Sequence, residues 1–448
     1  MNLRERFLEV MVNFNPGVSP PKWEFGYWGD TINNWYEEGL KKNKYPKIPK
    51  KISTPTSSLY SPCWHSVPGG RLSDKNTHSV KGKSSAGASR PDGVRTAGKT
   101  GSSIERRLPA GVAVIGGGLY WPTQSFPIDN DVKGTLGMDK GQILVNVNLL
   151  FHPMFDLEIL EEDDHYLTYI DIDGVKKKYI KETGVIPPGI EWVIKDKKTW
   201  EKLKEERLNL NDIRGRFPAN WDDLLKKYKN RDYPLVLGGY PHGYFGTLAQ
   251  LMGYEHLFYN YFDDPDLIHD IQKTFTDLWI AVFSEVLSDT DVDMVIIWED
   301  ISAGTGSMVN PAAIKEFMLP YYKRLTGFLK ENGVKVIFVD TDGDCFDIIP
   351  LFIEGGVTGM YPIEASCGMD LYKVRMTFPR LQLMGGIPKL EIRHGKKRID
   401  EILEPVEKVL KFGGYVPFGD HLVPPEVHWK DFKYYREKLN RMIDNAGE

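Results

Sequence analysis

The chain has 448 residues, which is enough for one large domain with additions or for two domains. Charged residues make up 27% and the formal net charge is −5, so composition gives no electrostatic reason to expect binding to nucleic acid or to a membrane surface. Three cysteines without a CxxC spacing indicate neither a disulfide framework nor a cysteine-built zinc site. The start of the chain is too charged for a signal peptide, and no later window is apolar enough for a membrane span, so we expect a cytoplasmic protein.

Residues 1–65 are predicted to form a helical N-terminal extension, because the first 45 residues are rich in helix-forming and aromatic side chains. The next stretch has a different character. No aromatic residue occurs between Trp64 and Tyr120, and the small, polar and basic residues there bury too little apolar area to offset chain entropy. We interpret residues 66–112 as a flexible insertion; an error in the translated sequence is the alternative.

Residues 113–448 are predicted to form one α/β domain, a (β/α)8 TIM barrel. Apolar runs typical of buried strands alternate with segments of helical periodicity, which is the pattern of a parallel sheet. The runs are QILVNVNLL, YPLVLGGYP, DMVIIWED, VKVIFVDTD, GVTGMYPIE, LQLMGGIPK and GGYVPFGDH. Their spread over about 300 residues, without a nucleotide-type glycine fingerprint, favours a barrel over a doubly wound sheet.

The clearest predicted helix begins after Asn310. Asn310 suits the N-cap, Pro311 suits the first helical position, and Gly333 is expected to end the helix. Pro320 lies inside the segment and is expected to kink it.

Polar side chains follow the apolar runs, at the points where the predicted strands end. In a barrel these carboxyl ends meet at one mouth, where active sites of this fold lie. The residues are His242, Trp298, Glu299, Asp300, Asp340, Asp342, Glu364, Lys389, Asp420 and His421. Each has a structural alternative: the aspartates can be turn or capping residues, His242 a packed loop histidine, Glu364 an arginine partner and Lys389 a surface residue. Their convergence on one rim favours a site.

Asp340 and Asp342 lie two positions apart in an extended segment, so both side chains are expected to point the same way. Together with His421 they would present one nitrogen and two oxygen ligands to a metal ion and leave coordination positions open. We therefore expect a divalent metal, either zinc or a harder cation. The alternative is a group of carboxyls that share a proton or clamp a cationic ligand.

The second half of the chain resembles the uroporphyrinogen decarboxylase superfamily, which includes the decarboxylase itself and corrinoid-dependent methyltransferases. The segments that carry this resemblance are DDPDLIHDI, WEDISAGTGSMVNPAAIKEFMLPYYKRL, LMGGIPK and GGYVPFGDHLVPPEVHWKDFKYY. At the start, RERFLEVM and WEFGYWGDTINNWYEEGL are similar to the opening of the methyltransferase-like members. The resemblance covers residues 1–45 and 120–445 and implies a TIM barrel.

Residue by residue, Asp340-Thr341-Asp342-Gly343 falls where zinc-containing methyltransferases of the superfamily have His-x-Cys-Gly. His421 falls where those enzymes have a later zinc-binding cysteine and the decarboxylase has a histidine near its substrate. Because aspartates replace His and Cys, the resemblance argues against a thiol-activating zinc and leaves room for a harder metal. The paired arginines with which the decarboxylase grips its acidic substrate have no counterpart here.

The resulting hypothesis is an enzyme that moves a methyl group between a small methylated substrate and a corrinoid carried by a partner protein. The expected metal ligands are Asp340, Asp342 and His421; the expected catalytic residues are Glu299, as general acid or further ligand, with His242, Asp300 and Glu364; and the expected substrate contacts are Trp298, Tyr361 and Asp420. One alternative is a cofactor-free decarboxylase acting on a porphyrin-like acid, which predicts a cationic mouth. The other is a non-catalytic barrel that serves as a binding partner or sensor.

Overall fold

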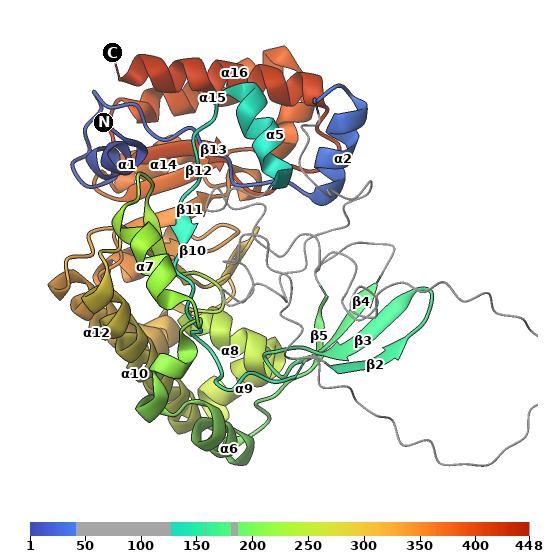
Figure 1. Ribbon diagram of the computed structural model, residues 1–448, viewed down its shortest axis with the longest axis vertical. Helices are drawn as coiled ribbons and strands as arrows, with labels where there is room; N and C mark the ends of the chain where they lie inside the picture. Colours follow the sequence, from blue (N-terminus) through green and yellow to red (C-terminus); the bar gives the residue numbers. More distant parts are fainter. Residues whose placement is uncertain (42–126, 157, 181–186, 448) are drawn as a thin grey trace, which may run out of the picture.

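The structure, a computed structural model, describes residues 1–41, 127–156, 158–180 and 187–447 (Figure 1). Its centre is a seven-stranded parallel sheet in the order β1-β6-β7-β10-β11-β12-β13. The strands are β1 (Ile143–Leu144), β6 (Leu235–Gly238), β7 (Met294–Trp298), β10 (Ile337–Asp340), β11 (Gly359–Ile363), β12 (Gln382–Ile387) and β13 (Tyr415–Gly419). From β6 onward these strands are buried almost throughout, which explains the continuous apolar runs in the sequence.

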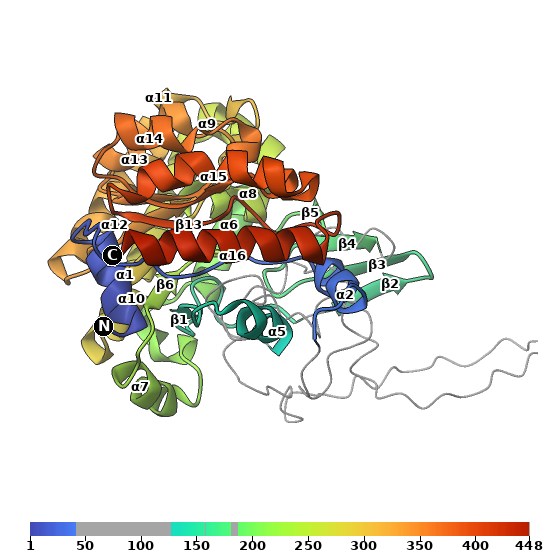
Figure 2. The same ribbon diagram turned by 90° about the horizontal axis from the view of Figure 1, so that it is seen from above.

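Helices follow the strands and cover the outside of the curled sheet (Figures 1 and 2). They are α6 (Lys197–Arg207), α7 (Trp221–Lys229), α8 (Tyr244–Met252), α9 (Tyr254–Asp263), α10 (Pro265–Asp289), α11 (Pro311–Ala313), α12 (Leu319–Glu331), α13 (Ile349–Glu354), α14 (Leu371–Thr377), α15 (Lys396–Leu410) and α16 (Trp429–Ala446). This alternation of parallel strands and helices confirms the predicted α/β class of the TIM-barrel type.

The helix predicted after Asn310 forms with the expected start, and its interior is irregular. The Asn310 side chain accepts a hydrogen bond from the Ala312 amide at 2.8 Å, as an N-cap does. A π-helical turn, Ile314–Met318, separates α11 from α12. Pro320 lies at the start of α12 and has no N–H to donate, which explains why the regular hydrogen-bond ladder is interrupted there.

An extended N-terminal segment, residues 22–28, occupies the space between β1 and β13, the two end strands of the described sheet. On one side, the Trp23 indole donates to the carbonyl of Lys140, just before β1, at 2.7 Å. On the other side, the Val423 amide donates to the carbonyl of Gly26 at 2.9 Å, just after β13. The segment runs between the C-terminal helix and β1 (Figure 2) and stands where a further strand would close the barrel.

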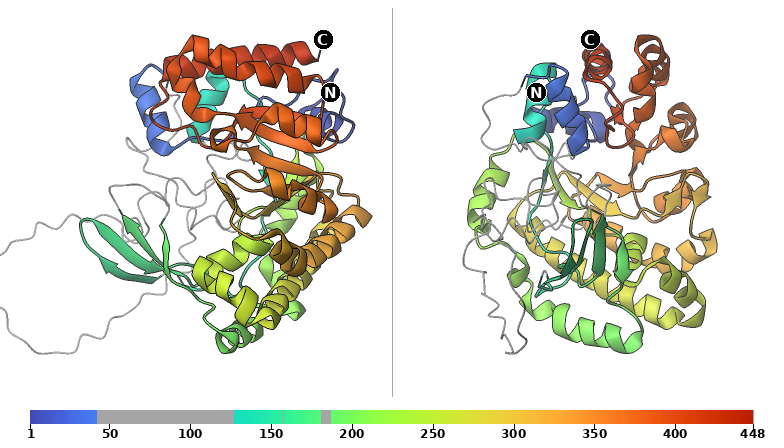
Figure 3. Two further views of the ribbon diagram at one scale, coloured as in Figure 1. Left: turned by 180° about the vertical axis from the view of Figure 1, so that it is seen from behind. Right: turned by 90° about the vertical axis from the view of Figure 1, so that its right-hand side faces the viewer.

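A separate four-stranded antiparallel sheet, in the order β2-β3-β4-β5, projects from the barrel near α8 and α9 (Figures 1 and 3). Its strands are β2 (Glu158–Glu162), β3 (Tyr166–Ile170), β4 (Lys176–Ile180) and β5 (Gly189–Glu191). Lys177 is buried in this sheet, with its Nζ 2.7 Å from Asp171 and 2.8 Å from Asp173. Asp173 also accepts a hydrogen bond at 2.7 Å from Gln250 of α8, which ties the sheet to the barrel.

The remaining described elements are short. They are α1 (Leu3–Met11), α2 (Gly29–Glu37), α5 (Pro127–Leu136), β8 (Ser302–Ala303), β9 (Gly306–Ser307) and 3-10 turns at Leu210–Asp212, Arg214–Arg216, Phe346–Ile348, Ala365–Cys367 and Lys389–His394. The predicted boundary at residue 65 and the predicted insertion at residues 66–112 lie outside the described residues. Among the described helices, none combines the length and apolar character needed to cross a membrane.

Candidate active site

Three aspartates gather at the carboxyl ends of β7 and β10; we call Asp300, Asp340 and Asp342 the acidic cluster. Asp340 ends β10, and its Oδ2 accepts a hydrogen bond from the Tyr361 hydroxyl at 2.9 Å. Asp300 lies just beyond β7 with a φ of 45°, a left-handed conformation that aspartate adopts more readily than most residues. Asp342 is partly exposed two positions after Asp340. The structure therefore brings these three predicted site residues together.

The members of the acidic cluster hinder one another's ionisation. Burial raises the pKa of Asp340 well above its usual value, and the charge of Asp342 raises it further. The pKa of Asp300 is raised by burial and then by Asp342 and Asp340. Burial also raises the pKa of Asp342, although His421 opposes that rise. Carboxyl groups in this situation take up a proton or a cation more readily than isolated ones do.

His421 lies on the other side of Asp342, just after β13. Its Nε2 is 3.5 Å from Asp342 Oδ2, and its side chain is partly exposed. Phe25 of the N-terminal segment stacks on the imidazole, with ring centroids 4.8 Å apart and planes inclined by 29°. The sequence predicted the pairing of His421 with Asp342 but not the contribution of Phe25, which lies almost 400 positions earlier in the chain.

Lys389 supplies the positive charge next to the acidic cluster. Its Nζ lies 3.0 Å from Glu364 Oε1 and 3.6 Å from Asp420 Oδ1. Burial lowers the pKa of Lys389, but the carboxylates of Asp420 and Glu364 more than offset this and raise it. Burial likewise raises the pKa of Glu364, but the Gly343 amide, 2.7 Å away, and the Lys389 ammonium lower it overall. Lys389 is therefore part of the site rather than an isolated surface residue.

Asp420, expected to contact substrate, is fully buried and holds loops together. Its Oδ2 accepts the Ser366 amide at 2.7 Å, and its Oδ1 accepts the Lys389 amide at 2.9 Å. Both oxygens are thus engaged by the chain that follows β11 and β12. A carboxylate with both oxygens bonded to backbone amides is suited to positioning loops, and the expected contact of Asp420 with substrate stays a prediction.

Glu299, expected to be the general acid, caps a helix instead. The carboxylate is fully buried and accepts the amides of Tyr244 at 2.9 Å, Phe245 at 2.5 Å and Gly246 at 3.2 Å, at the start of α8. The hydroxyl of Tyr322 in α12 donates to Oε1, the oxygen that also accepts the Tyr244 amide. Burial raises the pKa of Glu299 to about 7, and the four donors oppose that rise. The protein itself thus occupies both carboxylate oxygens in this structure, and a catalytic role of Glu299 stays a prediction.

His242 is a core histidine rather than a rim residue. It lies between β7 and α10, with its ring centroid 4.5 Å from that of Trp279 and 5.1 Å from that of Phe283. Its Nδ1 is 2.8 Å from the carbonyl oxygen of Ile296. Burial lowers the pKa of His242 to about 4. The side chain is thus buried in the layer between sheet and helix, and the expected catalytic role of His242 stays a prediction.

The two aromatic residues predicted as walls differ in position. Trp298 is partly exposed at the end of β7 and packs edge-on against Tyr240, with ring centroids 4.7 Å apart. Tyr361 is fully buried and acts through its hydroxyl on Asp340. Trp298 alone of the pair can therefore offer a surface to a ligand.

The acidic cluster and His421 offer donor atoms that metal ions bind, but their side chains are not arranged as a complete coordination site. Among the residues that the structure describes, no group of three His, Cys, Asp or Glu side chains is arranged to hold a metal ion. The donor chemistry fits a hard cation, because Asp342 interacts with the carboxyl group of Asp340 and lies 3.5 Å from the imidazole of His421. Closing such a site requires side-chain movement at Asp340, Asp342 and His421.

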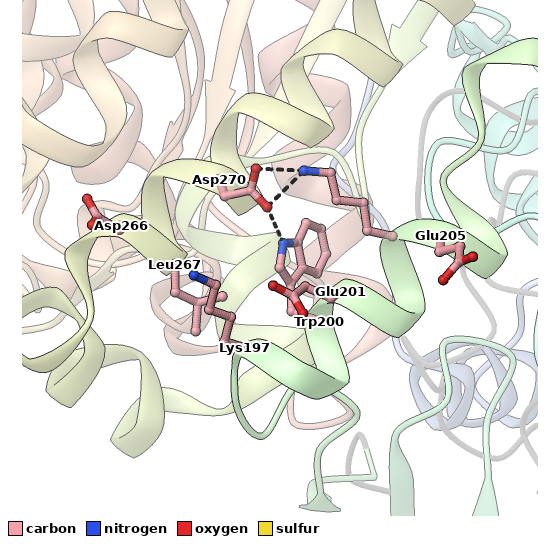
Figure 4. Close-up of a pocket in the computed structure, with 8 residues that line it drawn as sticks. Lys197, Trp200, Glu201, Glu205, Asp266, Leu267 and Asp270 are labelled. Atoms are coloured by element: carbon pink, nitrogen blue, oxygen red, sulfur yellow. Dashed lines mark hydrogen bonds and ion pairs between the residues drawn. The ribbon is translucent and has the colours of Figure 1, made fainter.

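A pocket of about 470 Å³ lies on the outer side of the barrel, between α6 and α10 (Figure 4). It is lined by Lys197, Trp200, Glu201, Lys204, Glu205, Asp266, Leu267 and Asp270. Asp270 accepts hydrogen bonds from Trp200 at 2.7 Å and from Lys204 at 2.6 Å, so its carboxylate is already satisfied. None of the predicted site residues lines this pocket, and we assign it no part in the chemistry.

Comparison with known proteins identifies the family. The family model described as uroporphyrinogen decarboxylase (URO-D) matches residues 169–438, which is more than half of the chain. No curated protein matches. Among solved structures, a methyltransferase from Methanosarcina mazei is 14% identical, with 72% of this chain and 86% of that chain covered and a TM-score of 0.45.

A second solved structure is a putative vitamin-B12 independent methionine synthase from Listeria monocytogenes. It is 11% identical, with 51% of this chain and 69% of that chain covered and a TM-score of 0.30. At this level of similarity neither structure adds to the argument about function. The family model does, and the chain belongs to the uroporphyrinogen decarboxylase family.

Proposed function

We propose that the protein is a methyltransferase-like enzyme that moves a methyl group between a small substrate and a corrinoid carried by a separate protein. The observation that carries this proposal is the charge at the strand ends. The acidic cluster and Glu364 outnumber Lys389 and His421 there. A substrate with several carboxylates would be repelled by this rim, so the acidic site favours methyl transfer over porphyrin decarboxylation.

The raised pKa values of the acidic cluster suit proton delivery. When a methyl group leaves a heteroatom, the electron pair that remains on the heteroatom is stabilised by a proton. The carboxyl group of Asp300, whose pKa is raised by burial and by the neighbouring aspartates, keeps its proton to a higher pH than an ordinary aspartate and could supply that proton. Trp298 would provide an apolar wall beside the reacting group.

A divalent cation would serve the same cluster. Asp340, Asp342 and His421 would hold it, with Asp300 as a neighbouring carboxylate. When bound, such a cation polarises the heteroatom of the substrate. Support comes from the mutual repulsion of the carboxyl groups and from the 3.5 Å separation of His421 and Asp342.

The proposal is tested by incubating the purified protein anaerobically with methylcobalamin and a panel of thiol and amine acceptors. We expect demethylation of the corrinoid, followed by absorbance, with at least one acceptor class. Asp342→Ala should abolish it, while the matched variant Asp347→Ala, an exposed aspartate five positions later, should retain it. Formation of coproporphyrinogen from uroporphyrinogen without added corrinoid would contradict the proposal and favour the decarboxylase. Absence of both reactions would favour a non-catalytic barrel.

A further inference from the structure

The N-terminal segment of residues 22–28 carries an unusual buried charge. Glu24 is 3% exposed, and its Oε1 accepts the amide of Gly419, the last residue of β13, at 2.6 Å. Its Oε2 accepts the hydroxyl of Tyr435 at 3.2 Å and lies 3.5 Å from the guanidinium of Arg436, which is fully buried. The carboxylate therefore connects this segment both to the end of β13 and to α16.

The contact between Glu24 and β13 requires a glycine on the other side. A Cβ at position 419 would lie 2.8 Å from Glu24 Oε1, which is closer than side chains tolerate. Burial raises the pKa of Glu24, while Arg436 and the Gly419 amide oppose that rise. A buried ion pair adds little net stability compared with an apolar pair of the same shape. The buried pair of Glu24 and Arg436 therefore serves more to fix the position of the N-terminal segment than to stabilise the fold.

The residues on either side of this contact reach the candidate site. Phe25, directly after Glu24, stacks on His421, and its ring also lies 6.4 Å from that of Tyr361. Tyr361 in turn donates to Asp340. On the partner side, Gly419 is two positions before His421 in the chain. The chain therefore reaches the imidazole of His421 within two positions of the Glu24–Gly419 hydrogen bond on either side: through Phe25 after Glu24, and through His421 itself after Gly419.

We propose that Glu24 and Phe25 are positioning residues that fix the His421 imidazole against Asp342. Glu24 would hold the backbone on both sides of the stack through Gly419 and Arg436, and Phe25 would restrict rotation of the imidazole ring. The N-terminal segment then does more than fill the space between β1 and β13. The inference rests on the proposed role of His421 in the site, but its geometric content can be tested without any activity.

The test uses histidine-labelled protein and the imidazole nitrogen shifts of His421 by NMR, assigned with His421→Gln. The Asp342→Asn variant supplies the reference for an imidazole without its carboxylate partner. At one fixed pH and without metal, Glu24→Gln and Phe25→Leu should move the His421 shifts more than halfway from the wild-type values towards those of Asp342→Asn. The control is Trp23→Phe, which removes the hydrogen bond to Lys140 and part of the indole packing against Phe7, away from the contact with His421.

Trp23→Phe should lower the melting temperature while leaving the His421 shifts at their wild-type values. Wild-type His421 shifts in both Glu24→Gln and Phe25→Leu, with only a lower melting temperature, would overturn the inference and leave the segment a purely structural role. If Glu24→Gln does not fold, Phe25→Leu decides the question alone. The methyl-transfer proposal can fail in its own assay without affecting this result, so the two failures are distinguishable.

Discussion

Two acidic strand ends lie side by side in this barrel and have opposite surroundings. At the end of β7, Glu299 receives three amides of α8 and the hydroxyl of Tyr322. At the end of β10, Asp340 receives a single hydroxyl, from Tyr361, and faces Asp342. A carboxylate supplied with donors serves the fold, whereas carboxylates that face one another are free to bind something from outside.

This difference shows what an acid after an apolar strand means. In the sequence, Trp298-Glu299-Asp300 and Asp340-Thr341-Asp342 give the same signal, because both follow buried strands. The donors that separate them come from α8 and α12, which are distant in sequence from Glu299. The assignment of structural and functional roles therefore depends on packing between helices, and the following variants test it.

Removing Glu299 should have the largest effect on stability. Glu299→Ala leaves three buried amides and a tyrosine hydroxyl without their acceptor, and we expect a loss of roughly 3–5 kcal/mol in the free energy of unfolding. Urea denaturation measures it. Glu299→Gln keeps one acceptor oxygen and should lose less. A loss from Glu299→Ala no larger than that from an exposed surface substitution would show that the cap is unimportant.

His242 should make the free energy of unfolding fall as the pH is lowered. Its folded pKa of about 4 lies below its usual value of 6.5, so the unfolded chain binds more protons between these values. The stabilising contribution is present above pH 6.5 and is lost as pH falls towards 4, by on the order of 2 kcal/mol between pH 7 and 5. His242→Asn should flatten this dependence in urea denaturation. An unchanged slope would contradict the burial of a neutral imidazole.

The contribution of Asp340 to stability should depend on pH in the opposite direction from that of His242, and Asp340→Asn tests this. The pKa of Asp340 is raised in the folded protein, so its contribution to stability is present below the usual aspartate pKa and is lost as pH rises. In chelator-treated protein at pH 8, the free energy of unfolding of the variant should therefore exceed that of wild type by on the order of 1 kcal/mol. The difference should be smaller at pH 5. A variant less stable than wild type at pH 8 would mean that the cluster is compensated by groups already present.

Asp347 should matter least. It is an exposed residue in the 3-10 turn after β10. It is close to the acidic cluster in sequence, but its side chain forms no hydrogen bond with the described residues of that cluster. Asp347→Ala should change the free energy of unfolding by no more than about 0.5 kcal/mol. A larger loss would place Asp347 among the interacting carboxylates.

The sequence predicted the fold well because buried parallel strands appear in it as continuous apolar runs, such as MVIIW in β7. Such runs can be recognised locally, without knowing which distant residues pack on the strand. The sequence also predicted that Asp342 and His421 would lie together, as they do; their role as metal ligands stays a prediction. It could not show that Glu299 caps α8 or that His242 packs under α10, because these contacts depend on how the helices pack on the outside of the sheet. Nor could it find Phe25, whose place beside His421 depends on the N-terminal segment lying between the two end strands.

The central claim is that the acidic cluster binds a cation from outside and that Glu299 does not. The most direct measurement is the metal content of protein purified under metal-replete conditions, for wild type, Asp342→Asn and Asp347→Asn. We predict a stoichiometric divalent metal in wild type and in Asp347→Asn, and its loss in Asp342→Asn, while the metal-free Asp342→Asn protein should melt no lower than metal-free wild type. Equal metal in all three, or none in wild type, would contradict the claim.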